Sequence, residues 1–101
     1  MTELAHARVR QLAPADLGGP GAPVAELCSA VAIAVLAEAA GPDFRMTSLA
    51  LDVATHPLTD APVDLIARVD KRARSIVFVS VEARSAERLV FSAQGLFSAI
   101  G

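Results

Sequence analysis

The stretch GGPGAPVAELCSAVAIAVLAEAAG, residues 18–41, joins a loop of glycine and proline to a run made almost entirely of Ala, Val, Leu and Ile. Pro23 suits the first turn of a helix, where its missing N–H costs nothing, and Gly41 followed by Pro42 suits a helix end. Apolar residues fall on every side of the cylinder that such a helix would form. The stretch therefore predicts one long helix over about residues 23–40, buried on nearly all sides.

After the helix, the pattern changes to a period of two, which is typical of strands with one face on a core. Pro57, Asp60 and Pro62 favour a turn, and a weaker alternation precedes residue 18. We predict one α+β domain over residues 1–101 that forms an antiparallel meander. Gly95 within the last strand indicates a bulge or a close backbone approach. The predicted strands cover about residues 5–12, 45–55, 63–73, 75–84 and 88–99.

Composition excludes several classes of function. The chain has 101 residues, 53% of them apolar, and a net charge of −2, which describes a soluble globular protein. Glu26 and Glu38 interrupt the longest apolar run, and the first ten residues lack a signal-peptide core, so we expect a cytoplasmic protein without a membrane partner. Without Trp or Tyr, and with acidic residues among the basic ones, it should not bind nucleic acid. One cysteine and two distant histidines predict no internal disulfide and no metal.

Three segments carry a resemblance to a known family: MTSLALDV at 46–53, VDLIARVDKRARSIVFVSVEA at 63–83 and LVFSAQGLFSAI at 89–100. With the glycine loop and helix, residues 5–100 resemble the hotdog fold of the acyl-CoA thioesterase superfamily, in its phenylacetate-type branch. The resemblance implies a curled sheet of about five strands wrapped around the helix, and subunits paired edge to edge as a homodimer or a dimer of dimers, that is, a homotetramer. It also implies an acyl-CoA-type thioester substrate, so that coenzyme A is part of the substrate and no separate cofactor is expected. An unpaired strand edge independently favours a dimer.

The family's catalytic signature is replaced in this chain. Members of the branch have His-Gly-Gly before the helix and an Asp within it, and the corresponding positions here hold Pro20-Gly21-Ala22 and Ser29. Gly21 and Ala22 could still offer backbone N–H groups to an oxyanion at the helix start. Glu26, on the same helical face as Ser29, is the nearest carboxylate and the candidate general base. The alternative is that Glu26 only interacts with the helix dipole.

The remaining candidates each have a structural alternative. The resemblance suggests that Thr47 positions the nucleophilic water for the partner subunit, and the alternative is an ordinary strand residue. Arg72 and Arg74 could bind coenzyme A phosphates or form a solvated outer face. We expect Cys28 and Ser29 in the core. Two further expectations are that His6 and His56 are solvated, and that Ile66, Phe78 and Val90 form an outer apolar patch, which would mark either a second oligomer contact or a covering element.

Two functions follow from these residues. The first is hydrolysis of an acyl-CoA-type thioester, with Gly21 and Ala22 polarising the carbonyl and Glu26 and Thr47 handling water. The second is a catalytically degenerate hotdog module that binds an acyl ligand or serves assembly without hydrolase activity. A hydratase or dehydratase of the same fold would need a histidine paired with an acid, and neither histidine is near the helix in sequence.

Overall fold

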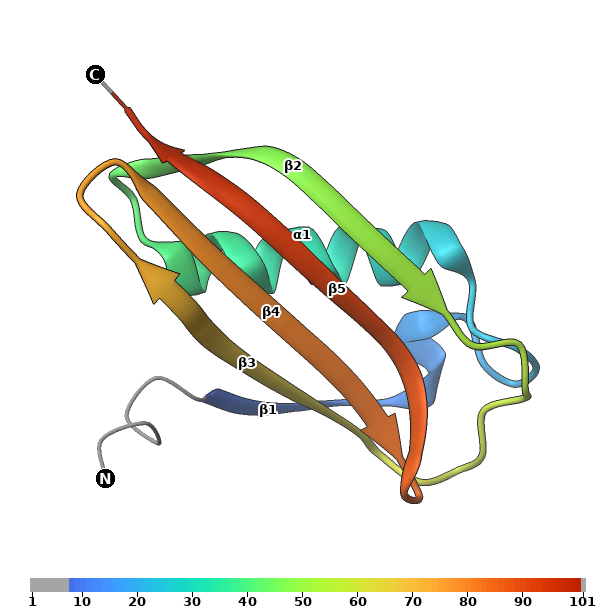
Figure 1. Cartoon of the computed structure of the whole chain (residues 1–101). Coiled ribbons are helices and arrows are strands. Elements are labelled where there is room, and N and C mark those ends of the chain that lie inside the picture. Colours follow the sequence, from blue (N-terminus) through green and yellow to red (C-terminus); the bar gives the residue numbers. More distant parts are fainter. Residues whose placement is uncertain (1–7, 101) are drawn as a thin grey trace.

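A computed structural model describes residues 8–100 of the chain. It contains one antiparallel sheet with strand order β1-β3-β4-β5-β2, and the helix α1 lies across one face of that sheet (Figure 1). The structure confirms the predicted α+β architecture of a curled five-stranded sheet and one helix. The elements are β1 (Arg8–Leu12), the 3-10 helix η2 (Pro14–Leu17), α1 (Ala25–Ala40), β2 (Phe44–Val53), β3 (Val63–Arg72), β4 (Ile76–Ser85) and β5 (Arg88–Ala99).

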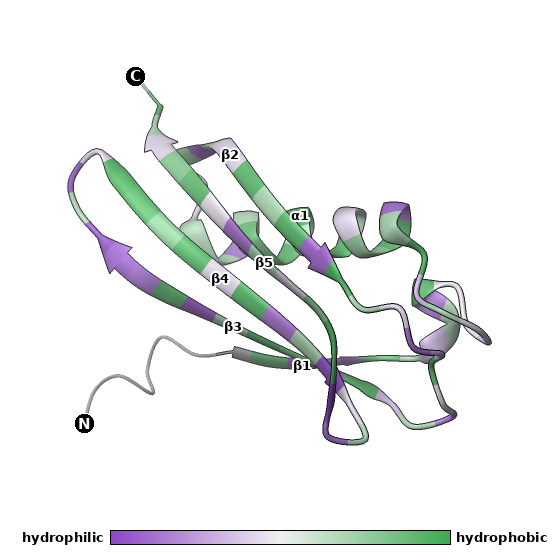
Figure 2. Cartoon of the chain, turned by 45° about the vertical axis from the view of Figure 1, so that its right-hand side comes forward, coloured by the Kyte–Doolittle hydropathy of each residue, from purple (hydrophilic) through white to green (hydrophobic). Residues whose placement is uncertain are grey.

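The core lies between α1 and the inner face of the sheet. Strand β4 alternates strictly, with Val77, Val79, Val81 and Ala83 buried, as its sequence predicts. Figure 2 shows the same alternation of hydrophobic and hydrophilic residues along the central strands. A period of two places every second side chain on one face, so the pattern fixes which face packs against the helix.

Only one side of α1 is buried in the single subunit. Its buried residues are Cys28, Ala32, Val35, Leu36 and Ala40, all facing the sheet. On the outward side, Leu27 is 40% exposed and Ile33 is 42% exposed. The expectation that the helix is buried on nearly all sides is therefore wrong for one subunit, because the sheet covers one side of the cylinder only. The apolar outward side remains uncovered.

Gly95 lies on the inner face of β5, with side chains of the core packed closely against it. A Cβ atom added there would lie 2.9 Å from the Phe97 ring and 3.3 Å from Cδ1 of Leu36. Gly95 itself pairs regularly with Leu49 and Val79, so no bulge occurs at this residue. Neither predicted reason for a glycine in this strand is found as stated, because the close contacts at Gly95 are with the side chains of Phe97 and Leu36 and not with a neighbouring backbone.

Bulges elsewhere change which side chains face the helix. The register shifts at Thr47 in β2, at Asp70 in β3 and at Val90 in β5. An extra residue in one strand reverses the alternation beyond it. Thr47 is consequently exposed instead of lying with the inward residues, and Val90 is buried instead of lying on the outer face. The alternation rule fails at these residues because it assumes an unbroken ladder.

Candidate functional site

A glycine loop positions the amino end of α1. The 3-10 helix η2 ends at Leu17 and is followed by Gly18, which has a φ of +93°. The N–H of Val24 donates to the carbonyl of Leu17 at 2.9 Å. A Cβ atom on Gly18 would lie only 2.4 Å from Cγ2 of Val24. Both the positive φ and the close contact require glycine. The loop thereby fixes where the helix begins.

A second loop holds the first one in place. Gly21, with a φ of +105°, accepts a hydrogen bond at 2.8 Å from the N–H of Leu58, which lies between β2 and β3. Gly21 and Ala22 are both exposed. These two loops form the rim around the amino end of α1, so the predicted residues Gly21 and Ala22 lie beside the helix start.

The amino end of α1 has free hydrogen-bond donors. No side chain caps it, and the N–H groups of Leu27 and Cys28 both donate to the carbonyl of Val24 at 3.0 Å. Among residues 8–100, the N–H groups of Ala22, Ala25 and Glu26 have no backbone acceptor. Unpaired N–H groups at the positive end of a helix dipole favour negative charge. This end can therefore receive an oxyanion or another anionic group.

The polar residues of the first helical turns have different environments. Glu26 is exposed, and within the described part of the chain its side chain makes no ion pair. Cys28 is fully buried, and this burial raises the pKa of its thiol. A thiol that resists ionisation is a poor nucleophile, so the interpretation of Cys28 as a core residue is confirmed. Ser29 is half-buried beside it.

Thr47 and Glu26 of one chain lie at opposite ends of α1. Strand β2 begins just beyond the carboxyl end of the helix (Figure 1), and Thr47 donates through Oγ1 to the carbonyl of Leu96 at 3.2 Å. A helix of 16 residues is about 24 Å long. A single subunit therefore does not bring these two predicted residues together.

Arg72 has a structural role that the sequence did not predict. The bulge at Asp70 turns Arg72 toward the helix, where its guanidinium donates to the carbonyls of Ala39 and Ala40, each at 3.3 Å. The same group lies 5.7 Å from the centre of the Phe44 ring. These contacts occupy donors that the sequence assigned to phosphate binding. Arg74 is exposed in the turn between β3 and β4.

His56 is not the solvated residue that its position in a turn predicts. It is half-buried, its Nε2 lies 3.0 Å from the carbonyl of Leu89, and its buried Nδ1 has no hydrogen-bond partner among the described residues. The imidazole thus connects the β2–β3 loop to β5. The alternation of β5 gives no signal for this contact, because it joins residues 33 positions apart through a backbone carbonyl. His6 lies outside the described residues.

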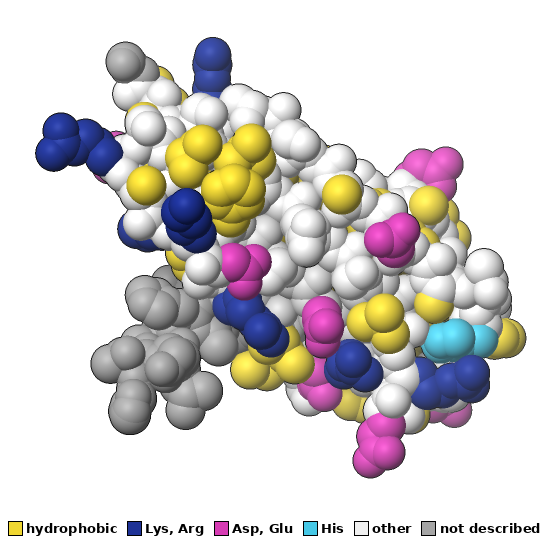
Figure 3. Space-filling model, in the orientation of Figure 1, with side chains coloured by type: hydrophobic (Ala, Val, Ile, Leu, Met, Phe, Trp, Pro, Cys, Tyr) yellow, Lys and Arg dark blue, Asp and Glu magenta, His cyan; other side chains and the backbone are white. Residues whose placement is uncertain are grey.

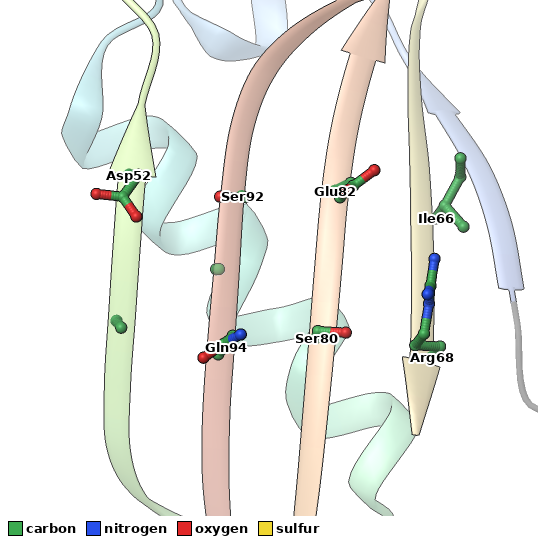
Figure 4. A pocket seen from close by; sticks show the side chains of 9 residues that line it. Asp52, Ile66, Arg68, Ser80, Glu82, Ser92 and Gln94 are labelled. Carbon is green, nitrogen blue, oxygen red and sulfur yellow. The ribbon is translucent and has the colours of Figure 1, made fainter. Parts of the chain in front are cut away.

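The outer face of the sheet holds a separate polar hollow of about 320 Å³ (Figure 4). It lies on the side away from α1 and contains none of the residues predicted for catalysis or substrate binding. Among residues 8–100 no group of His, Cys, Asp and Glu could hold a metal ion. The lining residues are Ala50, Asp52, Ile66, Arg68, Ser80, Glu82, Ser92, Ala93 and Gln94.

No described helix combines the length and apolarity that a membrane crossing requires. No protein-family model matches the chain, and no curated protein matches its sequence. Solved structures do match.

The crystal structure of S. sahachiroi AziG is 25% identical, with a TM-score of 0.79, over 94% of this chain and 84% of that one. The E. coli PaaI protein from the phenylacetic acid degradation operon is 14% identical, with a TM-score of 0.73, over 94% of this chain and 72% of that one. A hypothetical thioesterase from Streptococcus pneumoniae TIGR4, solved with coenzyme A, is 11% identical, with a TM-score of 0.75, over 94% of this chain and 77% of that one. The element order, the sheet topology and these neighbours agree that the chain has the hotdog fold, and at the positions that correspond to His-Gly-Gly and Asp in the resemblance it carries Pro20-Gly21-Ala22 and Ser29.

Proposed function

We propose that the chain acts on an acyl-CoA-type thioester at the amino end of α1, in a site completed by a second subunit. The single observation that carries this proposal is the set of free N–H groups on Ala22, Ala25 and Glu26. They lie beside two loops that are joined by the hydrogen bond between Leu58 and Gly21. A thioester carbonyl develops negative charge when water attacks it, and fixed donors at a helix start stabilise such charge. A hotdog neighbour that was solved with coenzyme A supports the ligand class.

Each residue has a defined task in this proposal. The N–H groups of Ala22 and of the first helical turn bind the carbonyl oxygen. The Glu26 carboxylate, exposed at the same end, accepts a proton from the attacking water. Thr47 of a second subunit orients that water through its hydroxyl. Two subunits paired antiparallel along β2, an edge strand of the sheet, would bring Thr47 of one toward Glu26 of the other.

The second candidate function is binding of an acyl-CoA-type ligand without hydrolysis. One specific observation favours it: the predicted Asp position is Ser29, which is half-buried, and the nearby thiol of Cys28 is fully buried. Glu26 is then the only carboxylate at this end of the described helix. If Glu26 is only an acidic residue near a helix dipole, the site retains its donors but lacks a base.

Hydrolysis and binding can be separated with one substitution. We would measure thioester hydrolysis over a series of acyl-CoA chain lengths for the wild type and for Glu26→Gln, and coenzyme A binding by calorimetry for both. The hydrolase proposal predicts that Glu26→Gln lowers kcat by about 10²-fold or more and leaves binding nearly unchanged. Equal kcat values would remove Glu26 from the mechanism. Binding without any hydrolysis in the wild type would select the second function. A wild type that neither binds coenzyme A nor hydrolyses any thioester would contradict both proposed functions.

A further inference from the structure

The β2–β3 loop, residues 54–62, connects the sheet to the glycine loop beside the amino end of α1. On the sheet side, Nε2 of His56 lies 3.0 Å from the carbonyl of Leu89 in β5. On the other side, the N–H of Leu58 donates to the carbonyl of Gly21 at 2.8 Å, and the Leu58 side chain is buried. Two loop residues that are two positions apart thus contact β5 and the glycine loop.

The hydrogen bond from Leu58 fixes the direction of the peptide between Gly21 and Ala22. This peptide is trans, so its C=O and N–H groups lie in one plane and point in opposite directions. Its carbonyl points to Leu58. The N–H of Ala22, which has no backbone acceptor among residues 8–100, consequently points away from the β2–β3 loop. Glycine permits several orientations of this peptide, and the bond selects one of them.

His56 supplies one donor to β5 in an otherwise unfavourable environment. A carbonyl oxygen only accepts, so Nε2 carries the hydrogen. Nδ1 is buried without a partner among residues 8–100, and burial of an unpaired polar atom costs free energy. Figure 3 shows part of this ring, that of the only described histidine, at the side of the molecule where Figure 1 places the β2–β3 loop. A phenylalanine would fill the space without that cost, so the Nε2–H donor is what the histidine adds.

The chain between His56 and Leu58 is stiff. Pro57 lies between them, and its ring fixes its own φ and restricts the backbone of the residue before it. The start of the loop is fixed as well, because the N–H of Ala54 donates to the carbonyl of Val90 at 2.9 Å. A displacement of the His56 ring from β5 is therefore passed on to Leu58.

We propose that His56 is a positioning residue for the site at the amino end of α1, an inference that rests on the function proposed above. Its Nε2–H holds the β2–β3 loop on β5, and the loop holds the N–H of Leu58 against the Gly21 carbonyl. The N–H of Ala22 is thereby directed to the place where the thioester oxygen binds. Donors that are fixed before the reaction stabilise developing charge without reorganising. His56 acts in this way without touching the substrate.

The first test needs no ligand: it is amide hydrogen exchange in His56→Phe, which keeps a ring but lacks the donor. We expect exchange of the Leu58 amide to become at least about 5-fold faster, as for the loss of one hydrogen bond, and the amide signal of Ala22 to shift. Amides of β4, in the middle of the sheet, report global unfolding and should change less. Unchanged or slower exchange at Leu58 would show that the ring only fills space and would overturn the proposal.

A second pair of variants isolates the donor if His56→Phe loses its native circular dichroism spectrum. His56→Gln keeps an N–H donor at the reach of Nε2 and should restore most of the Leu58 protection, whereas the shorter His56→Asn should not. Equal exchange in these two variants would overturn the proposal. The matched control is Thr59→Val, because Thr59 accepts from the N–H of Ala61 at 3.1 Å, a bond that stays within the loop. This control should leave the Ala22 signal in place.

The second test connects this position to catalysis. In thioester hydrolysis we expect His56→Phe to lower kcat by about 10-fold or more with a smaller change in KM, because the misplaced donor acts on the transition state. His56→Gln should recover kcat, and Thr59→Val should keep it. An active wild type whose kcat is unaffected in His56→Phe would overturn the proposal. A wild type that neither binds nor hydrolyses a thioester would contradict the proposed function instead, and the exchange data would then decide whether His56 orients the Gly21–Ala22 peptide.

Discussion

The two ends of α1 are completed in different ways. At the carboxyl end, the N–H of Gly41 donates to the carbonyl of Ala37 at 3.1 Å, and Arg72 donates to the carbonyls of Ala39 and Ala40. At the amino end no side chain caps the helix, and the N–H groups of Ala25 and Glu26 have no backbone acceptor among residues 8–100. One end is closed by the protein itself, and the other is left to solvent or a ligand.

This difference assigns the two ends of α1 different roles: the carboxyl end contributes to stability, and the amino end is available for function. Every helix leaves backbone groups unpaired at its ends, and these groups must be satisfied by caps, water or ligands. Contacts at the carboxyl end fix the helix against β2 and β3. The amino end keeps its donors and the positive end of the dipole, and the surrounding loops hold these groups in place without pairing them. Substitutions at each end should therefore affect different measurements.

The largest effect on stability is expected at the glycine loop. Gly18→Ala forces a side chain into a φ of +93° and to within 2.4 Å of Cγ2 of Val24. We predict a loss of about 2–4 kcal/mol in the free energy of unfolding, from backbone strain and overpacking together. Urea denaturation measures this loss.

Gly21→Ala is the matched control for the loop. Gly21 also has a positive φ, of +105°, but a Cβ atom there would contact nothing within 4 Å. Its cost should be limited to backbone strain, about 1–2 kcal/mol. Equal losses for Gly18→Ala and Gly21→Ala would show that the contact with Val24 does not fix the start of α1.

A smaller effect is expected at the carboxyl end. Arg72→Met removes two hydrogen bonds from a charged donor and the contact with the Phe44 ring. Because the guanidinium is exposed and screened by solvent, we predict a loss of only about 1–2 kcal/mol. Arg74→Met, at an exposed turn, should change stability by less than about 0.5 kcal/mol. If Arg72→Met loses ligand binding without losing stability, the carboxyl end would be involved in binding, which contradicts the roles proposed for the two ends of α1.

The smallest effect is expected where β1 joins the helix. Arg10 and Glu38 form an ion pair whose side chains are 51% and 48% exposed. Exposed pairs contribute about 0–1 kcal/mol, so Glu38→Gln should lower the free energy of unfolding by no more than that. Thermal unfolding at low and high salt measures it, and a large loss that persists at high salt would contradict a screened surface pair.

The sequence predicts the elements of this fold well because burial follows simple periods. The alternation of β4 and the Gly41 stop of α1 both depend on local chemistry, and both appear in the structure. The inner and outer faces of β2, β3 and β5 could not be predicted throughout, since each has a bulge at which the alternation reverses. A bulge depends on the partner strand, which a single strand's pattern does not contain.

The candidate site is predictable only where it depends on the main chain. Gly21 and Ala22 precede a helix in the sequence, and a helix start supplies N–H groups whatever its side chains are. Arg72 caps α1 by donating to the carbonyls of Ala40 and Ala39, which lie 32 and 33 positions away in the sequence. No local pattern therefore indicates this role. The roles of Glu26 and Thr47 stay predictions, because one subunit keeps them at opposite ends of the helix.

The most direct test is to observe both ends of α1 while a ligand binds. The probe is the analogue of hexanoyl-CoA in which a methylene replaces the thioester sulfur, so that the carbonyl is kept and hydrolysis is prevented. In a ¹⁵N-labelled protein we predict saturable amide shifts at Ala22, Ala25 and Glu26, with little change at Gly41. No saturable shifts, or the largest shifts at the Gly41 end, would contradict the assignment of the open amino end as the binding site.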